Sequence, residues 1–549
     1  MKRIHRITML FCIAVAVLLA VVACTPTSDE DVQLTSITTP DTTTPETTTP
    51  DTTTPEATTP EATTPEVTTP EAMPPEVTTP DGTIAPEITT PEETTPAETT
   101  PEQIVPQEPI LCGDALSSYV IVYDEQASDY TVRAALYIAE QIRVRTGVAL
   151  PTVPIGASDI TNPHEIVVGE TVRPISQSLD ADTEGFEFAL LADDDHIALE
   201  GDHFIIAAAA YYFVETYIPG AVFDTDVSQT VSICTPIVKK AENFILLIGD
   251  GMGFNQTKLF DAYADRPISD DYSDGEDCFY GYLFPYIGEA KTNSLSGTTD
   301  SAAAGTALAS GYKTVNGYIG KDGNLNDVFS LTELAAAVGK ATAVMSTEGQ
   351  TGATPASFSA HANSRNDGNA ILASQAELVA QYGTIIDCSY NFYTEAEMVA
   401  LRAAITRTLN ALSEDEDGFF VMYEEAYIDK HCHNNNAAEA YLAMLRFNQA
   451  IALFMEYAFY NPDTMVIITA DHETGGLQIA ANGDFYYTSG SHTSANVPLF
   501  AYGADCAAFD GAVIENTQIP KTIAALFGSE IEGSNPVQHP ALVPIEQES

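Results

Sequence analysis

The sequence predicts an α/β fold: a three-layer sandwich with a largely parallel central sheet, preceded by a small α/β domain and a disordered linker. Two observations predict the sandwich. Beyond Lys240 the apolar runs are continuous rather than alternating, which is typical of strands buried on both faces of a sheet. These runs alternate with helical segments such as 330–338 and 437–457, as expected when helices cover both faces. A third observation, a repetitive N-terminal region, predicts the linker.

The first residues have the layout of a secretory signal peptide. Three basic residues within the first six precede an apolar run over 7–22, which is short for a transmembrane span. The run ends in Val-Val-Ala-Cys, which resembles a bacterial lipobox. We therefore expect residues 1–23 to be a lipoprotein signal peptide and Cys24 to anchor the exported protein to the outer face of the cell membrane or the cell surface. Ordinary cleavage nearby, with release of the protein, is the alternative.

The segment 24–110 is predicted to be a disordered tether. It repeats a five-residue unit of an acidic residue, threonines and proline, as in 41–45 and 46–50. Proline at every fifth position removes backbone donors, and the acidic residues repel one another. Such a composition cannot bury enough apolar surface to fold. The folded part of the chain is therefore expected to begin near residue 111.

The charge balance of the chain is strongly acidic. It has 78 Asp and Glu against 21 Lys and Arg, a formal net charge of −57. Because nucleic-acid binding requires a basic patch, we expect none. We interpret the acidity as a solvated surface. A phosphate site on this chain would have to be made locally positive by metal ions or arginine.

Residues 111–236 are predicted to form a small α/β accessory domain. Around 166–169 and 197–201 the pattern resembles accessory domains of some glycoside hydrolases, which leaves glycan binding through residues 112–235 open. His196 and His203 are interpreted as surface or structural side chains. Export permits disulfides, and a Cys112–Cys234 pairing is a hypothesis. The expected elements are strands at 118–123 and 165–169, a hairpin of 186–191 and 196–200, and helices at 130–145 and 207–217.

Residues 240–530 are predicted to be the catalytic domain, followed by a C-terminal tail over 531–549. Its apolar runs each end in polar side chains that can bind metals, and the carboxyl ends of parallel strands share one edge of a sheet. Taken singly, each cluster has a structural interpretation, such as a turn at Asp250 and Gly251. Together, mixed oxygen and nitrogen ligands suit zinc and an oxygen-only set suits magnesium. The predicted strands and their ends are 244–248 with Asp250, 343–345 with 346–348, 419–423 with Glu424, and 465–469 with Asp471 and His472.

Ser301 begins a predicted helix of small residues over 302–308. Free N–H groups and the helix dipole at such an N-terminus favour an anion, either a serine alkoxide or a phosphate. Taken alone, the segment is better explained by an ordinary helix cap at Asp300 or Ser301.

Four segments together resemble the alkaline phosphatase family, in the same chain order and over about residues 243–528. They are Asp-Ser-Ala at 300–302, Gly-Asp-Gly-Met-Gly at 249–253, Thr-Ala-Asp-His-Glu-Thr-Gly-Gly at 469–476 and Ser-His-Thr at 491–493. The resemblance implies hydrolysis of small-molecule phosphate monoesters through a phosphoserine intermediate at Ser301. It also implies two zinc ions and one magnesium ion, and a homodimer is left open.

The resemblance further implies a role for each matching residue. One zinc would be held by Asp250, Asp471 and His472, the second by Asp429, His433 and His492, and the magnesium by Asp250, Thr354 and Glu424. Arg365 would bind the non-bridging phosphate oxygens, because a planar guanidinium can donate two hydrogen bonds to them.

One position departs from the family pattern. Gly352 stands where the family usually has an Asp or His that reaches toward magnesium-bound water and phosphate, while Lys430 follows Asp429. Because glycine supplies no such contact, we expect altered magnesium affinity and phosphate release. His431 and Cys432 lie between predicted ligands and are interpreted as bystanders.

Two other functions remain as alternatives. A sulfatase of the same superfamily would need Pro and Arg after the nucleophile, which residues 301–305 lack, and a phosphodiesterase often uses Thr and lacks the counterpart of Arg365. The other alternative is a surface carbohydrate-binding protein that uses residues 112–235.

Overall fold

The computed structural model describes residues 107–531, except for 157–158, 160, 180–184, 228–230, 261–277, 389–394 and 530. The predicted signal peptide, nearly all of the predicted tether and the C-terminal tail lie outside the described residues. Residues 100–549 form one compact unit, which contains every described residue. No helix in this described part is both long and apolar enough to cross a membrane.

Residues between 120 and 234 form a six-stranded sheet in which only β6 runs against the others, because it forms the predicted hairpin with β7. Helices α2 (Asp129–Thr146) and α4 (Ile206–Tyr217) contact one face, and the short α3 (Pro174–Gln177) packs on the other. The predicted strands and helices of this segment are therefore confirmed. In spatial order the strands are β4 (Thr152–Ile155), β3 (Val120–Asp124), β5 (Glu165–Val168), β7 (His196–Glu200), β6 (Phe188–Ala192) and β9 (Ser232–Cys234).

A smaller three-stranded sheet lies at the start of the described chain, and its strands are β2 (Asp114–Ala115), β1 (Ile110–Leu111) and β8 (Asp224–Thr225). Cys112 follows β1. Its thiol lies near Asp226 and Tyr119, whereas the thiol of Cys234 lies near Tyr212. Both cysteines are free, so the hypothesis of a disulfide between them is wrong for this structure.

The large sheet has eight strands, and β20 alone runs opposite to the rest. The predicted, largely parallel sheet is therefore confirmed. In spatial order the strands are β13 (Ile385–Cys388), β12 (Ala341–Ser346), β14 (Phe419–Glu425), β10 (Asn243–Gly249), β15 (Thr464–Thr469), β20 (Val497–Tyr502), β11 (Tyr286–Lys291) and β21 (Val513–Glu515).

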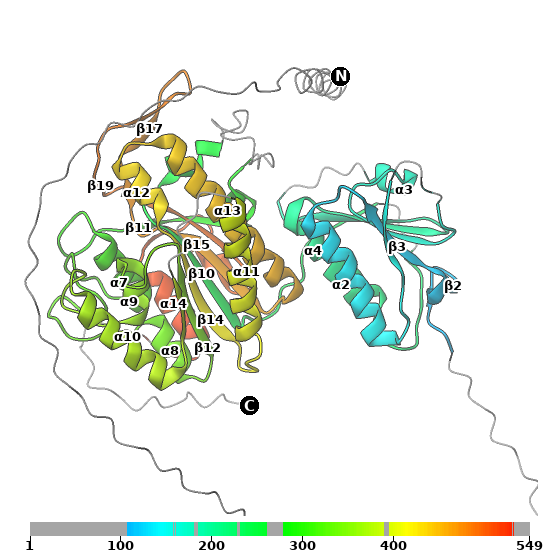
Figure 1. Cartoon of the computed structure of the whole chain (residues 1–549), viewed down its shortest axis with the longest axis horizontal. Coiled ribbons are helices and arrows are strands. Elements are labelled where there is room, and N and C mark those ends of the chain that lie inside the picture. The colour runs from blue at the N-terminus through cyan, green and yellow to red at the C-terminus, as the bar shows by residue number, and fades with distance from the viewer. Residues whose placement is uncertain are drawn as a thin grey trace, which may run out of the picture. The chain divides into compact units, whose positions relative to one another are not determined.

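Helices cover both faces of the large sheet, so the chain has the three layers that its sequence predicts (Figure 1). The first helical layer contains α7 (Ser301–Ser310), α8 (Leu331–Ala337), α9 (Ala353–Ser359), α10 (Gly368–Tyr382) and α14 (Gln518–Leu526). The second contains α11 (Glu395–Leu412), α12 (Tyr427–His433) and α13 (Ala437–Tyr460), with the short α5 (Phe254–Thr257) against α13. Two short hairpins follow β15, pairing β16 (Glu473–Thr474) with β19 (His492–Thr493), and β17 (Leu477–Ile479) with β18 (Phe485–Tyr487).

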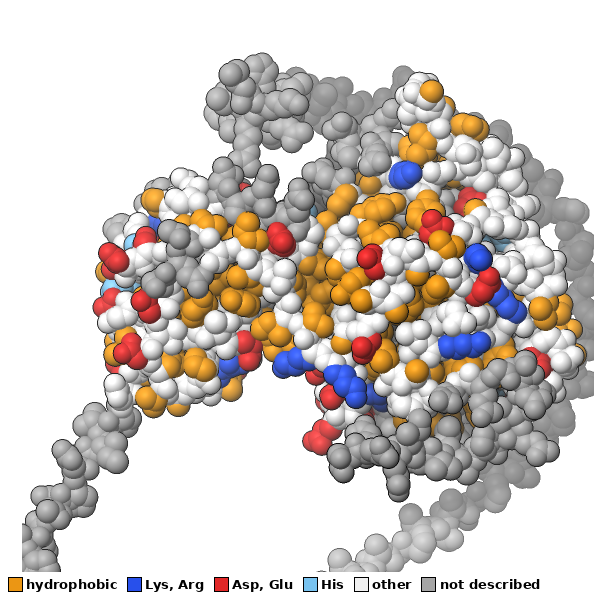
Figure 2. All heavy atoms as spheres, turned by 180° about the vertical axis from the view of Figure 1, so that it is seen from behind, with side chains coloured by type: hydrophobic (Ala, Val, Ile, Leu, Met, Phe, Trp, Pro, Cys, Tyr) orange, Lys and Arg blue, Asp and Glu red, His pale blue; other side chains and the backbone are white. Residues whose placement is uncertain are grey.

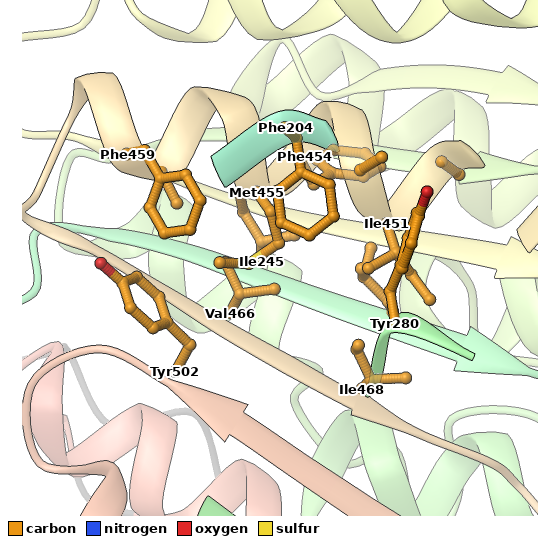
Figure 3. Packing of buried hydrophobic residues seen from close by; sticks show 14 of the residues in the cluster. Phe204, Ile245, Tyr280, Ile451, Phe454, Met455, Phe459, Val466, Ile468 and Tyr502 are labelled. Atoms are coloured by element: carbon orange, nitrogen blue, oxygen red, sulfur yellow. The ribbon is translucent and has the colours of Figure 1, made fainter. Parts of the chain in front are cut away.

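One hydrophobic cluster contains residues from both of the larger sheets. Phe204, in the short helix η2 (His203–Ile205), is fully buried and stacks on Phe459 of α13, with ring centroids 5.9 Å apart. Figure 3 shows side chains of α13 packed against Ile245 of β10 and Val466 of β15. Burying a side chain of this size contributes about 1.5–3 kcal/mol. Helix α13 thereby holds the central strands, and so their carboxyl ends, in place.

Charge is sparse on the face of the molecule shown in Figure 2. The Lys and Arg side chains of the described residues lie there singly or in small groups among hydrophobic and uncharged ones. This face therefore has no broad basic surface in the described part of the chain. An anionic ligand on this face would need positive charge supplied locally, within its own binding site.

Candidate active site

The carboxyl ends of the central strands bring several acidic residues together. Ile248 of β10 pairs in register with Glu424 on one side and with Thr469 on the other. The residues just beyond these positions, Asp250 and Asp471, therefore emerge at the same edge as Glu424. This convergence at the carboxyl edge is the one that the sequence predicts.

Strand β14 sends two consecutive glutamates to opposite faces of the sheet, because strand side chains alternate. Glu425 points toward α13 and forms a buried ion pair with Arg446, at 2.9 Å. Glu424 points the other way. One of its oxygens accepts a hydrogen bond from Ser346, while the other is buried without a partner. Glu425 is thus neutralised within the fold, whereas Glu424 keeps a free oxygen for a ligand.

The first metal-binding group consists of Asp250, Asp471 and His472, whose ligand atoms lie within 4.8 Å of one another. His472 Nε2 is 3.1 Å from Asp471 Oδ2, 3.6 Å from Asp250 Oδ1 and 3.2 Å from the Ser301 hydroxyl. All four side chains are buried, and Asp250 Oδ1 and Asp471 Oδ2 have no hydrogen-bond partner. Unpaired buried carboxylate oxygens are costly, so these atoms fit a bound cation.

The turn after β10 explains how the carboxylates come so close. Gly251 has a φ of +76°, a left-handed conformation that favours glycine. A Cβ added there would lie 2.8 Å from the Cα of Asp429. The Gly251 N–H also donates to Asp471 Oδ1 over 3.1 Å. This turn therefore brings Asp250 beside both Asp429 and Asp471.

The second metal-binding group consists of Asp429, His433 and His492. His433 Nδ1 is 2.8 Å from the carbonyl oxygen of Gly490, and His492 Nδ1 is 3.0 Å from that of Thr299. A carbonyl oxygen can only accept, so each Nδ1 carries a proton, and the neutral form of each ring would present a lone pair at Nε2.

The two Nε2 atoms of His433 and His492 lie only 3.0 Å apart, and 3.3 and 3.5 Å from Asp429 Oδ1. Three lone-pair donors that face one another repel unless a cation lies between them. Backbone carbonyls that orient ligand imidazoles in this way are typical of metal sites. The donor set therefore fits zinc, which binds imidazole and carboxylate.

Thr474, which the sequence interpretation did not single out, links the two groups. Its hydroxyl donates to Asp429 Oδ1 over 2.5 Å and lies 3.2 Å from His472 Nδ1. Because its proton is used at Asp429, Nδ1 of His472 donates and Nε2 is left unprotonated toward Ser301. Burial, with a smaller effect from His492 and His433, lowers the pKa of His472 well below its ordinary value, which also keeps the ring neutral. Only the folded contacts reveal this role, although Thr474 lies within the motif at 469–476.

The third group offers oxygen atoms alone. Thr354, near the start of α9, is fully buried, and its hydroxyl lies beside the carboxyl group of Glu424 without a hydrogen bond of ordinary geometry. One oxygen each of Asp250 and Glu424 is also buried without a hydrogen bond of ordinary geometry. Burial, reinforced by neighbouring carboxylates, raises the pKa of Asp250 and of Glu424 well above the ordinary range. Oxygen donors of this kind fit magnesium.

At the start of α7, Asp300 and Ser301 have different roles. Asp300 is the helix cap, because its Oδ1 accepts from the N–H of Ala303 over 3.0 Å. Its Oδ2 lies 3.2 Å from Nη1 of Arg365. Ser301 is the first helical residue, and its hydroxyl is free to face His472. The ordinary cap interpretation therefore applies to Asp300 and leaves Ser301 available for chemistry.

The structure brings every predicted site residue into these groups or beside them, and it leaves the predicted bystanders out. His431 lies near Glu439 and Arg446. Cys432 is buried against Gln256 and Tyr487. Neither belongs to a group of possible metal ligands in the described chain.

Comparison with known proteins agrees with this geometry. A family model described as "Alkaline phosphatase" matches residues 241–387 and 385–490. The predicted resemblance to the alkaline phosphatases is confirmed. Alkaline phosphatase 4 of Bacillus subtilis (strain 168) is 28% identical over 315 residues, which cover 47% of this chain and 68% of that protein. Alkaline phosphatase of Escherichia coli (strain K12) is 26% identical over 411 residues, covering 53% and 87%.

Among solved structures, the alkaline phosphatase from the Antarctic bacterium TAB5 aligns with 53% of this chain and 99% of its own, at 26% identity and a TM-score of 0.45. The family match and the grouped ligands together indicate a metal-binding hydrolase of phosphate esters. The family match begins at residue 241, so it leaves out residues 111–236. Their resemblance to glycoside-hydrolase accessory domains stays a prediction.

We expect the metal-free protein to lose stability as the pH rises from about 4 to about 7. Burial raises the pKa of Asp471 to about 7, so the native state keeps a proton that the unfolded chain has already released. That stabilisation is present at low pH and disappears as the pH passes the native pKa. Melting temperatures of chelator-treated protein, followed by circular dichroism across this range, check the slope.

The matched variant is Asp471→Asn, which keeps the shape of the side chain but cannot titrate. Its melting temperature should depend less on pH than that of the unaltered protein. Parallel profiles for the two proteins would contradict the assignment.

Proposed function

We propose that this protein is an extracytoplasmic alkaline phosphatase that hydrolyses phosphate monoesters through a phosphoserine intermediate on Ser301. One observation carries the proposal: the Ser301 hydroxyl lies 3.2 Å from Nε2 of His472, beside buried carboxylate oxygens that lack hydrogen-bond partners. The family match and relatives at 28% and 26% identity support the general reaction, and the site residues support the specific one.

The residues fit two zinc ions and one magnesium ion. The proposed zinc ligands are Asp250, Asp471 and His472 for one ion and Asp429, His433 and His492 for the other, and the proposed magnesium ligands are Asp250, Thr354 and Glu424. When bound, cations at these positions would supply the positive charge that lowers the pKa of a hydroxyl and stabilises a leaving oxygen.

The start of α7 prepares Ser301 as the nucleophile. As the first residue of a ten-residue helix, it lies where unpaired N–H groups and the helix dipole favour negative charge. In the proposed reaction its oxygen bonds to phosphorus as the ester bond breaks, and the alcohol leaves. Water then cleaves the phosphoserine and releases phosphate. Burial of Ser301 limits access of bulk water to this oxygen.

Arg365 would select monoesters. Asp300 holds one of its guanidinium nitrogens, Nη1, and the side chain is still 36% exposed, so it can reach into the site from the rim. A planar guanidinium donates two parallel hydrogen bonds to two oxygens of a phosphoryl group. A monoester offers three non-bridging oxygens, whereas a diester has lost one of them to its second substituent. The two parallel hydrogen bonds of the Arg365 guanidinium therefore fit a phosphate monoester better than a diester.

Ser301→Ala should lower the rate of hydrolysis of a chromogenic phosphomonoester by at least about a thousandfold, because the attacking oxygen is removed. The assay uses purified protein supplied with zinc and magnesium, with and without chelator. Ser310→Ala is the matched control, since Ser310 is a buried serine at the other end of α7 whose hydroxyl donates to Thr306. A Ser301→Ala enzyme as active as the control would rule out the mechanism.

Arg365→Ala should reduce kcat/KM for a phosphomonoester by roughly 10- to 100-fold, the value of one or two charge-assisted hydrogen bonds. For a phosphodiester of the same alcohol the loss should be smaller. Arg402→Ala is the control. This arginine lies exposed on α11, and its guanidinium donates a hydrogen bond to Gln449. Equal losses on the two substrates would show that Arg365 does not discriminate between them.

We further propose that the protein is exported and held at the outer face of the membrane by a lipid on Cys24, with residues 24–110 as a tether. The basic, apolar and Val-Val-Ala-Cys layout of the first 24 residues supports this proposal, and these residues lie outside the described ones. Cys24→Ser should abolish incorporation of labelled palmitate and release the protein from the membrane fraction. Labelling that persists in the Cys24→Ser protein would refute the anchor.

A further inference from the structure

Gly352, the position that departs from the family pattern, is not surrounded by empty space. A Cβ added to it would lie 1.9 Å from Oε1 and 2.2 Å from Cδ of Glu348. The backbone at Gly352 has a φ of −56°, which any residue can adopt. The carboxyl group of Glu348 thus occupies the place that another side chain would take, so a larger residue at 352 would have to displace the end of the Glu348 side chain.

Glu348 reaches this place from the carboxyl end of β12. Its backbone N–H donates to the hydroxyl of Ser346 over 3.0 Å, and that hydroxyl donates in turn to Glu424. Its Oε2 lies 2.8 Å from Nζ of Lys430, while Oε1 projects over Gly352. An ion pair with Lys430 thus holds one oxygen of Glu348, and the hydroxyl of Ser346 connects the Glu348 backbone to Glu424 through hydrogen bonds.

Lys430 connects the pair to the other side of the site. It follows Asp429, a residue of the second metal-binding group, on α12. Its Nζ also lies over the ring of Tyr427, 4.3 Å from the centroid, which limits its movement. The ion pair between Glu348 and Lys430 therefore bridges the oxygen-only group and the Asp429 group.

The oxygen-only group itself points to a cation. Its members Asp250, Thr354 and Glu424 each have a buried oxygen without a partner, and each side chain is at least nine-tenths buried. Glu348 lies against Gly352, two residues before Thr354, and its backbone N–H binds the Ser346 hydroxyl that donates to Glu424. Glu348 is thus a further negative oxygen donor beside this group, held by Lys430.

We propose that Glu348, paired with Lys430, is a positioning residue for the magnesium ion of this site, and that Gly352 is the residue that admits it. The proposal rests on the proposed function, since it concerns the same metal group. Glu348 adds negative charge and an oxygen acceptor for the cation or its water, and Lys430 fixes its orientation. In this proposal, the contact that Gly352 cannot supply comes from residue 348.

The test measures magnesium affinity of the full-length, zinc-loaded protein by calorimetric titration with magnesium chloride, with no substrate present. Glu348→Gln keeps the size of the side chain and should weaken magnesium binding about 10- to 100-fold. Lys430→Met should weaken it less, because the carboxylate remains. Glu377→Gln is the matched control: it removes the same charge from an exposed position on α10 and should leave the affinity unchanged.

Gly352→Ala tests the role of space. Its new methyl group should displace Glu348 and weaken magnesium binding as much as Glu348→Ala does. The double variant that carries both Gly352→Ala and Glu348→Ala should bind magnesium no more weakly than Glu348→Ala alone, since the carboxyl group to be displaced is already gone. Melting temperatures of the metal-free variants show whether each is folded, and a purely structural role would lower these temperatures without changing the magnesium affinity of the folded protein.

Unchanged affinity in Glu348→Gln, or additive losses in the double variant, would overturn the proposal. Its failure is distinguishable from failure of the proposed function, because binding is measured without turnover. A Ser301→Ala protein with normal magnesium affinity and full hydrolysis would refute the mechanism at Ser301 alone.

Discussion

Buried negative charge is the constraint on which this site depends. Asp250, Glu424, Asp429 and Asp471 are all at least nine-tenths buried at one edge of the sheet, and three of them have an oxygen with no partner. Such an arrangement is unfavourable in a protein on its own, because desolvated carboxylates repel one another. Protons retained by these carboxyl groups or cations bound between them relieve this repulsion, so the protonation, the metal affinity and the stability of this edge are linked.

The fold supplies the rigidity that holds these charges together. Helix α13 packs its apolar side chains on β10 and β15 and uses Arg446 to neutralise Glu425 on the far face of β14. The preceding residue, Glu424, is thereby left as the charge that faces the site. Glu425, which is paired, and Glu424, which has an unpaired oxygen, are consecutive in the sequence. Because strand side chains alternate, they point to opposite faces of the sheet.

Two other sets of residues near the site also divide structural contacts from contacts with the site. Asp300 caps α7 and holds Arg365, which frees Ser301 for chemistry, and Thr474 orients His472 while binding Asp429. The sequence alone could indicate the ligand types, because an apolar strand that ends in Asp, Glu or His is visible in one dimension. It placed Glu348 in a polar cluster at a strand end but could not indicate its contact with Gly352 or the role of Thr474, because a hydroxyl or carboxyl group gains its role only from partners in the folded chain.

Apart from the ligand assignments that the family resemblance implies, the sequence by itself determined the class of fold, many of the strands and helices along the chain, and the residue types at strand ends that can bind metals. These depend on local patterns of burial and on residue chemistry. The tertiary structure decided which carboxylates remain unpaired, that Cys112 and Cys234 stay free, and which side chain fills the space beside Gly352. Such outcomes depend on distances of a few ångströms between residues far apart in sequence. Gly352 shows this most directly, since what fills its space comes from a different residue.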